Sequence, residues 1–239
     1  MRVLLRGSGA DAPWVGKRVS LDDEEVQHLR VRRAKDGDKV EFLNGSGLLG
    51  RGVLVQLGRE WLVEVMATEV QQAPAPLTLA VAAGDRDRFS WMVEKAVELG
   101  VTRVVPLESN RTVGVATRLK ESHIARLRRS ALETTKQCGA AWAPTVETPV
   151  SLSEFISESL GGTGWLADQD GVPAPASLDQ SPLTVLVGPE GGLTSEERKA
   201  ASIAGYQPVT LGSHTLRFET AALAAAAAVT QARMRRSNA

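Results

Sequence analysis

Residues 183–220 read LTVLVGPEGGLTSEERKAASIAGYQPVTLGSHTLRFET, and this stretch organises the prediction for the rest of the chain. Its first half predicts a short buried strand at 184–187, directly followed by the turn Gly-Pro-Glu-Gly-Gly at 188–192. A helix is expected next, because Thr194 and Glu197 have the spacing of a capping box.

The second half of the stretch repeats the same strand–turn–helix pattern. A strand at 207–211 leads into the turn 212–217, and an Ala-rich helix is expected from about Glu219. In an open α/β sheet, ligands bind beyond the carboxyl ends of the strands. The two turns are therefore predicted to form the walls of one pocket.

The composition of the first turn indicates the kind of ligand. Glycine lets a ligand approach the backbone, and Pro189 removes one amide donor. No G-x-G-x-x-G joins a strand to a helix, and G-x-x-x-x-G-K-[ST] is absent from the sequence. Glu190 would repel a phosphate, so a neutral or cationic ligand such as an adenosine carrying a sulfonium fits better. A tight turn without a ligand is the alternative.

Composition excludes several classes of protein. The 239 residues are 43% hydrophobic and 23% charged, as in ordinary globular proteins. The single cysteine, Cys138, excludes an internal disulfide and an all-cysteine metal site, and the three histidines lack metal-ligand spacing, so no metal is expected. The longest apolar run, 221–229, is shorter than the ~18 residues of a membrane span. With no signal peptide in view, the sequence predicts a cytoplasmic protein away from membranes.

Charge is balanced overall but clustered along the chain. The formal net charge is zero, from 28 basic and 28 acidic residues. Residues 26–35 contain four basic residues and no acid, and residues 103–136 contain eight basic residues against three acids. Three arginines follow near the C-terminus, at 233, 235 and 236. Solvated faces are the default interpretation, but three clusters in a neutral protein favour a surface divided by sign.

Two domains and a linker are predicted. Residues 1–72 have the alternating patterns and turn signals of a small β-rich domain, with strands expected at 39–43, 48–57 and 61–67. A short helix should begin at Asp22, capped by Ser20. Residues 73–76 read Ala-Pro-Ala-Pro and favour an extended linker. Residues 77–239 alternate strands and helices, which indicates a mainly parallel sheet.

Several motifs together resemble one known family. They are Val187–Thr194, Leu211-Gly212 with Leu216–Ala221, Lys95–Val101, Pro106–Arg111, and His28–Arg33 with Gly37-Asp38. In this order they resemble the 16S ribosomal RNA uridine N3-methyltransferase family, of the SPOUT class of S-adenosylmethionine-dependent enzymes. The resemblance runs from about residue 1 to 234.

The resemblance implies a fold and a reaction. It implies a SPOUT-type mainly parallel sheet with a C-terminal trefoil knot, preceded by a PUA-like barrel that binds RNA, in a homodimer. A barrel that only supports the larger domain is the alternative for residues 1–72. The implied reaction is transfer of a methyl group from S-adenosylmethionine to N3 of a uridine, conventionally numbered 1498, in 16S ribosomal RNA of the small ribosomal subunit.

The resemblance also implies site residues. The expected cofactor-binding residues are Leu166, Val187, Gly188, Pro189, Glu190, Gly191, Gly192, Leu211, Gly212, Leu216, Glu219 and Thr220. The expected RNA-binding residues are Arg30, Arg32, Arg33, Lys35, Arg86, Arg88 and Lys95. Arg111 and Arg217 are catalytic candidates that would stabilise negative charge on the base, although either arginine could equally hold an RNA phosphate. No general base is identified.

Two positions depart from the family's pattern. Where the family carries arginine in a Glu-Gln-x-x-Arg segment, this chain has Ala140, and where it carries arginine after Leu-Gly-x, this chain has His214. Each change removes a cation that could contact RNA. The arginine missing at position 140 fits a second hypothesis, a SPOUT methylase with another RNA target. A third hypothesis is a non-catalytic RNA-binding protein whose cofactor pocket has decayed, against which the intact turn at 188–192 argues.

Overall fold

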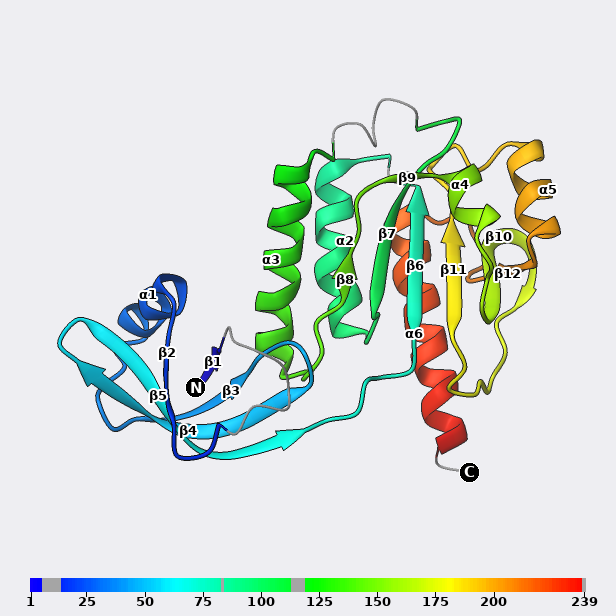
Figure 1. The fold of residues 1–239 in the computed structure, drawn as a ribbon. Helices are drawn as coiled ribbons and strands as arrows, with labels where there is room; N and C mark the ends of the chain where they lie inside the picture. Colours follow the sequence, from blue (N-terminus) through cyan, green and yellow to red (C-terminus); the bar gives the residue numbers. More distant parts are fainter. Residues whose placement is uncertain (6–13, 83, 113–118, 238–239) are drawn as a thin grey trace. The chain divides into compact units, whose positions relative to one another are not determined.

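The chain forms two compact units, shown in Figure 1. The computed structural model describes residues 1–5, 14–82, 84–112 and 119–237. The first unit comprises Met1–Ala73 with Leu132–Ala143, and the second comprises Pro74–Ala131 with Pro144–Ala239. The segment Leu132–Ala143, which lies in the predicted second domain, thus clusters with the N-terminal residues, because its side chains pack there.

The first unit is a five-stranded sheet with one helix, α1 (Asp23–Val31). The strands are β1 (Arg2–Leu4), β2 (Arg18–Ser20), β3 (Lys39–Leu43), β4 (Leu48–Leu57) and β5 (Glu60–Val70), in the order β1-β3-β4-β5-β2. Only β1 and β3 pair in parallel among the described strands of this sheet. The three strands predicted between residues 39 and 67 are confirmed.

Glycine shapes the centre of this sheet. The register of β4 and β5 shifts between Arg51 and Gly52, which marks a bulge. A Cβ atom at Gly50 would collide with the ring of Phe42, which is fully buried.

The predicted cap of α1 is wrong, because Asp22 accepts the backbone hydrogen bond of Glu25 at 2.9 Å and Ser20 belongs to β2.

The second unit is built on a seven-stranded sheet in which every described pairing is parallel. The strand order is β12-β10-β11-β6-β7-β8, and β9 also pairs with β7. The strands are β6 (Leu77–Ala82), β7 (Arg103–Glu108), β8 (Thr145–Val146), β9 (Val150–Ser151), β10 (Thr163–Pro173), β11 (Leu183–Val187) and β12 (Tyr206–Thr210). The predicted mainly parallel sheet is confirmed.

Five further helices are described, four of them wholly in the second unit, whereas the helix at 121–138 belongs to the first unit from Leu132 onward. They are α2 (Arg86–Glu98), α3 (Glu121–Cys138), α4 (Leu152–Ser157), α5 (Ser195–Ile203) and α6 (Phe218–Ser237). Strand β6 is buried along its whole length, and its alternate residues point to opposite faces. Leu79 and Val81 pack in the cluster that contains α2 and α6, whereas Ala80 and Ala82 pack in the cluster that contains α4 and α5. The sheet is therefore covered on both faces, as Figure 1 illustrates.

Caps and strand pairing set the bounds of several elements in this unit. Helix α2 begins at Arg86, because Asp85 caps it through the amides of Asp87 and Arg88. Strand β10 continues to Pro173 through a register shift between Ala167 and Val172, because it pairs with β12 there. The capping box at the start of α5 is confirmed.

Two predicted basic clusters are less open than their sequence indicates. Arg233 is buried, and its guanidinium donates hydrogen bonds to the carbonyls of Ala75, Pro76 and Ser181 at 3.1, 3.0 and 2.7 Å. Burial lowers the pKa of Arg233 below its ordinary value. In the cluster at 103–136, Arg103 pairs with Glu147 at 2.6 Å.

Among the described residues, no helix is long and apolar enough to span a membrane.

Candidate active site

The turns that follow β11 and β12 enclose one cavity in the second unit. Its volume is about 270 Å³, close to the ~300–1,000 Å³ typical of small-molecule sites. The parallel pairing of β10 with both strands places their carboxyl ends at the same edge. The cavity is lined by Leu166, Ala167, Asp168, Gln169, Val187, Gly188, Pro189, Glu190, Gly191, Gly192, Leu193, Arg198, Thr210, Leu211, Gly212, His214, Thr215, Leu216, Phe218 and Ala221.

The structure brings most of the predicted cofactor-binding residues together here. Ten of the twelve line the cavity, namely Leu166, Val187, Gly188, Pro189, Glu190, Gly191, Gly192, Leu211, Gly212 and Leu216. Glu219 and Thr220 are not among its lining residues: Glu219 is buried in the first turn of α6, and Thr220 is exposed. The turns after β11 and β12 thus line one cavity, as the sequence predicts.

The turn at 188–192 has a conformation that requires glycine. Gly192 has a φ of 70°, and its amide donates a hydrogen bond to the carbonyl of Pro189 at 2.8 Å. A Cβ atom at Gly191 would lie 3.3 Å from Cδ of Arg111. The loop after β7 therefore lies against the turn, and Glu197 fastens it by accepting the amide hydrogen bond of Asn110 at 2.8 Å.

Asp168, at the end of a strand that the sequence places at the mouth of the pocket, and side chains that the sequence does not predict complete the polar wall. Asp168 pairs with Arg198 at 2.8 Å, and the side chain of Asp168 is only 7% exposed. Thr215 donates a hydrogen bond to Oε1 of Gln169 at 2.8 Å, which joins the turn after β12 to β10. Arg198 gives no sequence signal, because nothing in a helical Glu-Glu-Arg-Lys run marks the third residue as facing a cavity.

The charges of the lining favour the ligand class that the sequence indicates. Asp168 and Arg198 neutralise each other, and the remaining ionisable side chains of the lining are Glu190 and His214. No excess of cationic groups faces the cavity, so a phosphate would gain little there. The backbone of a glycine turn with an apolar floor of Leu166, Val187 and Phe218 suits a neutral or cationic nucleoside.

The catalytic candidates lie at the edge of the cavity. Arg111 is exposed and lies beside Gly191 and Gly192, where an added Cβ atom would meet it, although it is not a lining residue. Arg217 is exposed between the lining residues Leu216 and Phe218, and its carbonyl accepts the amide hydrogen bond of Ala221. The structure therefore does not place the guanidinium of Arg217 in the wall.

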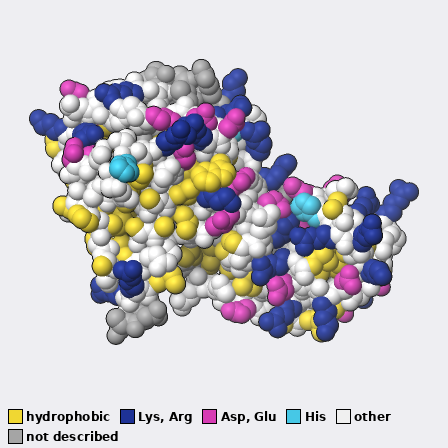
Figure 2. Space-filling model, turned by 180° about the vertical axis from the view of Figure 1, so that it is seen from behind, with side chains coloured by type: hydrophobic (Ala, Val, Ile, Leu, Met, Phe, Trp, Pro, Cys, Tyr) yellow, Lys and Arg dark blue, Asp and Glu magenta, His cyan; other side chains and the backbone are white. Residues whose placement is uncertain are grey.

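The predicted RNA-binding residues fall in both units. In the first unit Arg30, Arg32, Arg33 and Lys35 are all exposed on or just after α1. Figure 2 shows Lys and Arg side chains spread over this unit among acidic ones. In the second unit Arg86 pairs with Asp87, Lys95 pairs with Glu98 at 2.6 Å, and Arg88 lies near Glu190 and Glu219.

Comparison with known proteins decides the family. A family model described as an RNA methyltransferase domain matches residues 71–230, and one described as an RNA methyltransferase PUA domain matches residues 21–64. Ribosomal RNA small subunit methyltransferase E of Synechocystis is 32% identical over 223 residues, which are 88% of this chain and 72% of that protein. The chain belongs to the ribosomal RNA small subunit methyltransferase E family.

Further members of this family match over most of both chains. The relative from Aquifex aeolicus is 30% identical over 213 residues, covering 86% of this chain and 91% of that protein. The crystal structure of the Neisseria gonorrhoeae family member, bound to S-adenosylmethionine, is 28% identical, covers 95% of each chain and has a TM-score of 0.80. The expected PUA-like domain followed by a mainly parallel SPOUT-type sheet is confirmed.

The two departures from the family pattern have different settings. His214 lines the cavity, so the loss of an arginine there changes the wall of the site itself. Ala140 follows α3 and lies in the first unit, where it is half-buried. Of the two, only His214 bears on the cavity of this family member.

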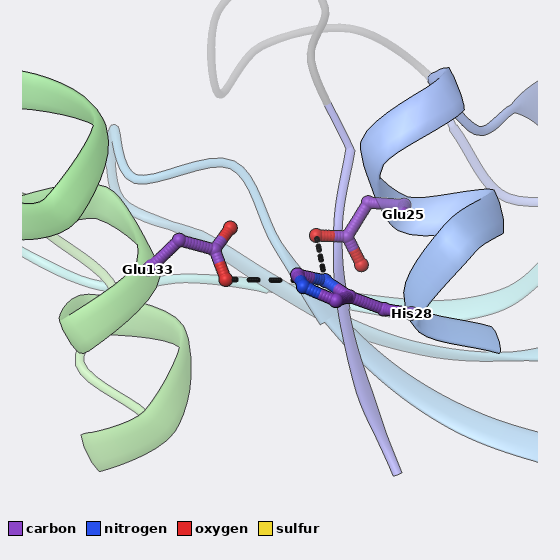
Figure 3. Close-up of side chains that lie close together, drawn as sticks. All are labelled: Glu25, His28 and Glu133. Atoms are coloured by element: carbon purple, nitrogen blue, oxygen red, sulfur yellow. Dashed lines mark ion pairs between the residues drawn. The ribbon is translucent and has the colours of Figure 1, made fainter. Parts of the chain in front are cut away.

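A cluster with metal-ligand chemistry lies in the first unit. Figure 3 shows Glu25 and His28 of α1 and Glu133 of α3 pointing toward one another. The ammonium of Lys136 lies 2.6 Å from Glu25, 2.8 Å from Glu133 and 3.2 Å from Nδ1 of His28. Burial raises the pKa of Glu25 above its ordinary value of 4.5, and the hydrogen bond from Lys136 opposes that shift. A metal ion would have to displace this ammonium, so the cluster is an internal ion-pair network.

Proposed function

We propose that this chain transfers a methyl group from S-adenosylmethionine to N3 of a uridine in 16S ribosomal RNA of the small ribosomal subunit. The observation that carries the proposal is the cavity formed by the two glycine-bearing turns. Its lining lacks a phosphate-type cradle, and the Neisseria gonorrhoeae relative holds S-adenosylmethionine. The cofactor supplies an activated methyl group on a sulfonium, so the protein's tasks are position and electrostatics.

The turn residues hold the cofactor in this proposal. The backbone of residues 188–192 wraps it, and Leu211, Gly212 and Leu216 close over its adenine side. Leu166 and Val187 form the floor. Glu219 and Thr220 contribute through the start of α6 rather than through the cavity lining. Backbone recognition explains why glycines, rather than charged side chains, dominate this wall.

The arginines act on the RNA. Arg111, which lies beside Gly191 and Gly192, stabilises negative charge that develops on the uracil ring. Arg217 and the exposed cations of both units bind phosphates, which positions the RNA without reading its sequence. Since the target atom lies on the base-pairing edge, the uridine has to be exposed or flipped.

The proposal extends to organisation. Residues 1–72 act as the RNA-binding domain, 73–76 as a linker and 77–239 as the methyltransferase domain, with a trefoil knot at its C-terminal end. The active form is a homodimer that works in the cytoplasm, where the small ribosomal subunit is assembled. A single, concentration-independent monomer mass in sedimentation would contradict the dimer.

Two experiments test the function. Calorimetry with S-adenosylmethionine should give a saturable heat, and the absence of heat would favour a non-catalytic RNA-binding protein. Mass analysis of 16S ribosomal RNA from a deletion strain should show loss of one N3-methyluridine. Persistence of the N3-methyluridine would refute the proposed target. It would favour the second candidate, a SPOUT methylase with another RNA substrate, which the alanine at position 140 supports.

A further inference from the structure

An arginine and two glutamates meet at the rim of the cavity, and none of them is a catalytic candidate from the sequence. Glu190 lies in the turn after β11 and lines the cavity. Nη1 of Arg88, in the first turn of α2, lies 3.9 Å from Oε1 of Glu190. Nε of the same guanidinium lies 4.0 Å from Oε1 of Glu219, in the first turn of α6. One cation thus faces two carboxylates from separate elements.

The two carboxylates differ in their surroundings. The side chain of Glu219 is 10% exposed, and its Oε2 atom has no hydrogen-bond partner among the described residues. A buried carboxylate is costly without a counter-ion, so Glu219 holds Arg88 in place. The side chain of Glu190 is 40% exposed and faces the cavity. Glu219 is therefore the anchor, and Glu190 is the carboxylate that a substrate can reach.

A glycine fixes Glu190 from the other side. A Cβ atom at Gly84 would collide with the carboxylate of Glu190, so this carboxylate lies directly against the Gly84 backbone. Arg88 and Gly84 together confine a side chain that stands in the mouth of the site. A general base has to lie within hydrogen-bond reach of the proton that it takes, and the carboxylate of Glu190 faces the cavity in which the base would lie.

Other ionisable groups of the cavity wall are less suited to accept a proton. Asp168 is already engaged by Arg198 at 2.8 Å and is nearly buried. His214 lines the cavity, but no hydrogen bond or ion pair to a described residue holds its side chain, which is exposed on the turn. Glu190 is the one lining carboxylate that is both held and accessible within the described part of the cavity.

We propose that Glu190 is the general base that takes the N3 proton of the uridine, and that Arg88 and Glu219 are its positioning residues. This inference rests on the proposed function. The N3–H bond breaks and its proton goes to a carboxylate oxygen of Glu190. The electron pair left on N3 forms the N–CH₃ bond, while the pair of the broken C–S bond stays on sulfur, which becomes a neutral thioether. The proton then passes from Glu190 to water.

The substitution Glu190→Gln tests the base, with Glu196→Gln as the matched control on an exposed glutamate outside the cavity. The substrate is small subunits from the deletion strain. At pH 7 the methylation rate of Glu190→Gln should fall by about 10²–10⁴-fold, because a positioned base contributes about that much. The deficit should shrink toward alkaline pH, where uridine loses its proton without help. Glu196→Gln should match the wild type.

Binding and activity separate the outcomes. Calorimetry should give Glu190→Gln the wild-type affinity for S-adenosylmethionine. Loss of that affinity would overturn the proposal, because the side chain would then hold the cofactor. A rate within about threefold of the wild type, or an unchanged pH profile, would also overturn it, and a collapse in His214→Gln instead would make His214 the base. Failure of the wild-type protein to methylate the subunit would defeat the proposed function itself.

The positioning residues have a readout independent of activity. Arg88→Ala should lower the thermal unfolding midpoint by leaving Glu219 buried without its cation, and adding Glu219→Gln should recover most of that loss. Glu219→Gln alone should reduce the rate about tenfold with an unchanged cofactor affinity, since coupled neighbours transmit effects of this size. Additive changes in the unfolding midpoint would show that Arg88 and Glu219 do not act together.

Discussion

The substitution Lys136→Met removes the ammonium that joins the carboxylates of Glu25 and Glu133 in the first unit. The ammonium lies 2.6 Å from Glu25 and 2.8 Å from Glu133, and the Lys136 and Glu25 side chains are 10% and 2% exposed. Removing one partner of a buried pair costs about 3–5 kcal/mol, because a desolvated charge is left uncompensated. The expected loss in the free energy of unfolding at pH 7.5 lies in that range.

The loss of unfolding free energy in Lys136→Met should depend on pH in a defined direction. The pKa of Glu25 is raised above 4.5 by burial and held down by Lys136, so the substitution raises it further. A raised folded-state pKa gives stability that is fully present below the unfolded-state pKa and lost as pH rises through the folded-state value. The deficit of Lys136→Met relative to the wild type should therefore be largest at neutral pH and shrink as pH falls toward 4.5.

Urea denaturation followed by circular dichroism, repeated across pH 4.5–7.5, measures the free energy of unfolding of the variant and of the wild type. Lys95→Met is the matched control, because Lys95 makes an ion pair of the same 2.6 Å length with Glu98 on an exposed helix surface. Its stability should stay close to the wild type. The double variant Glu25→Gln/Lys136→Met should recover most of the loss. Equal effects of Lys136→Met and Lys95→Met at pH 7.5 would refute the reasoning.

Three further predictions concern backbone positions. Gly192→Ala should weaken binding of S-adenosylmethionine about tenfold in calorimetry, because a φ of 70° in the cavity wall strains an alanine by about 1–2 kcal/mol. The control is Gly100→Ala, at a φ of 76° outside the cavity, which should leave the affinity unchanged. Arg33→Gly should raise the free energy of unfolding by about 1 kcal/mol, since Arg33 has a φ of 55°, while weakening RNA binding in a filter assay; a destabilised variant would contradict the strain argument. Thr194→Ala should cost about 0.5–2 kcal/mol through loss of the α5 cap, whereas Thr194→Ser should retain most of it in the same denaturation assay.

The sequence by itself determined what depends on neighbours along the chain. The capping box at Thr194 and Glu197 and the glycine turn at 188–192 are both fixed by a few consecutive residues. Hydrophobic alternation and strand–helix order were enough to indicate a mainly parallel sheet, because such a sheet requires crossover connections. The pocket followed from that sheet, since parallel strands bring their carboxyl ends to one edge.

The tertiary structure decided the partners of individual charges. Lys136 reads as part of a basic surface cluster but is buried between carboxylates, and Arg88 reads as an RNA contact but lies between two glutamates about 100 and 130 residues away along the chain. The extension of β10 beyond Ala167 likewise depends on its pairing with β12. Ion pairing and strand pairing across such separations depend on which surfaces meet in three dimensions, and local propensity carries no information about that.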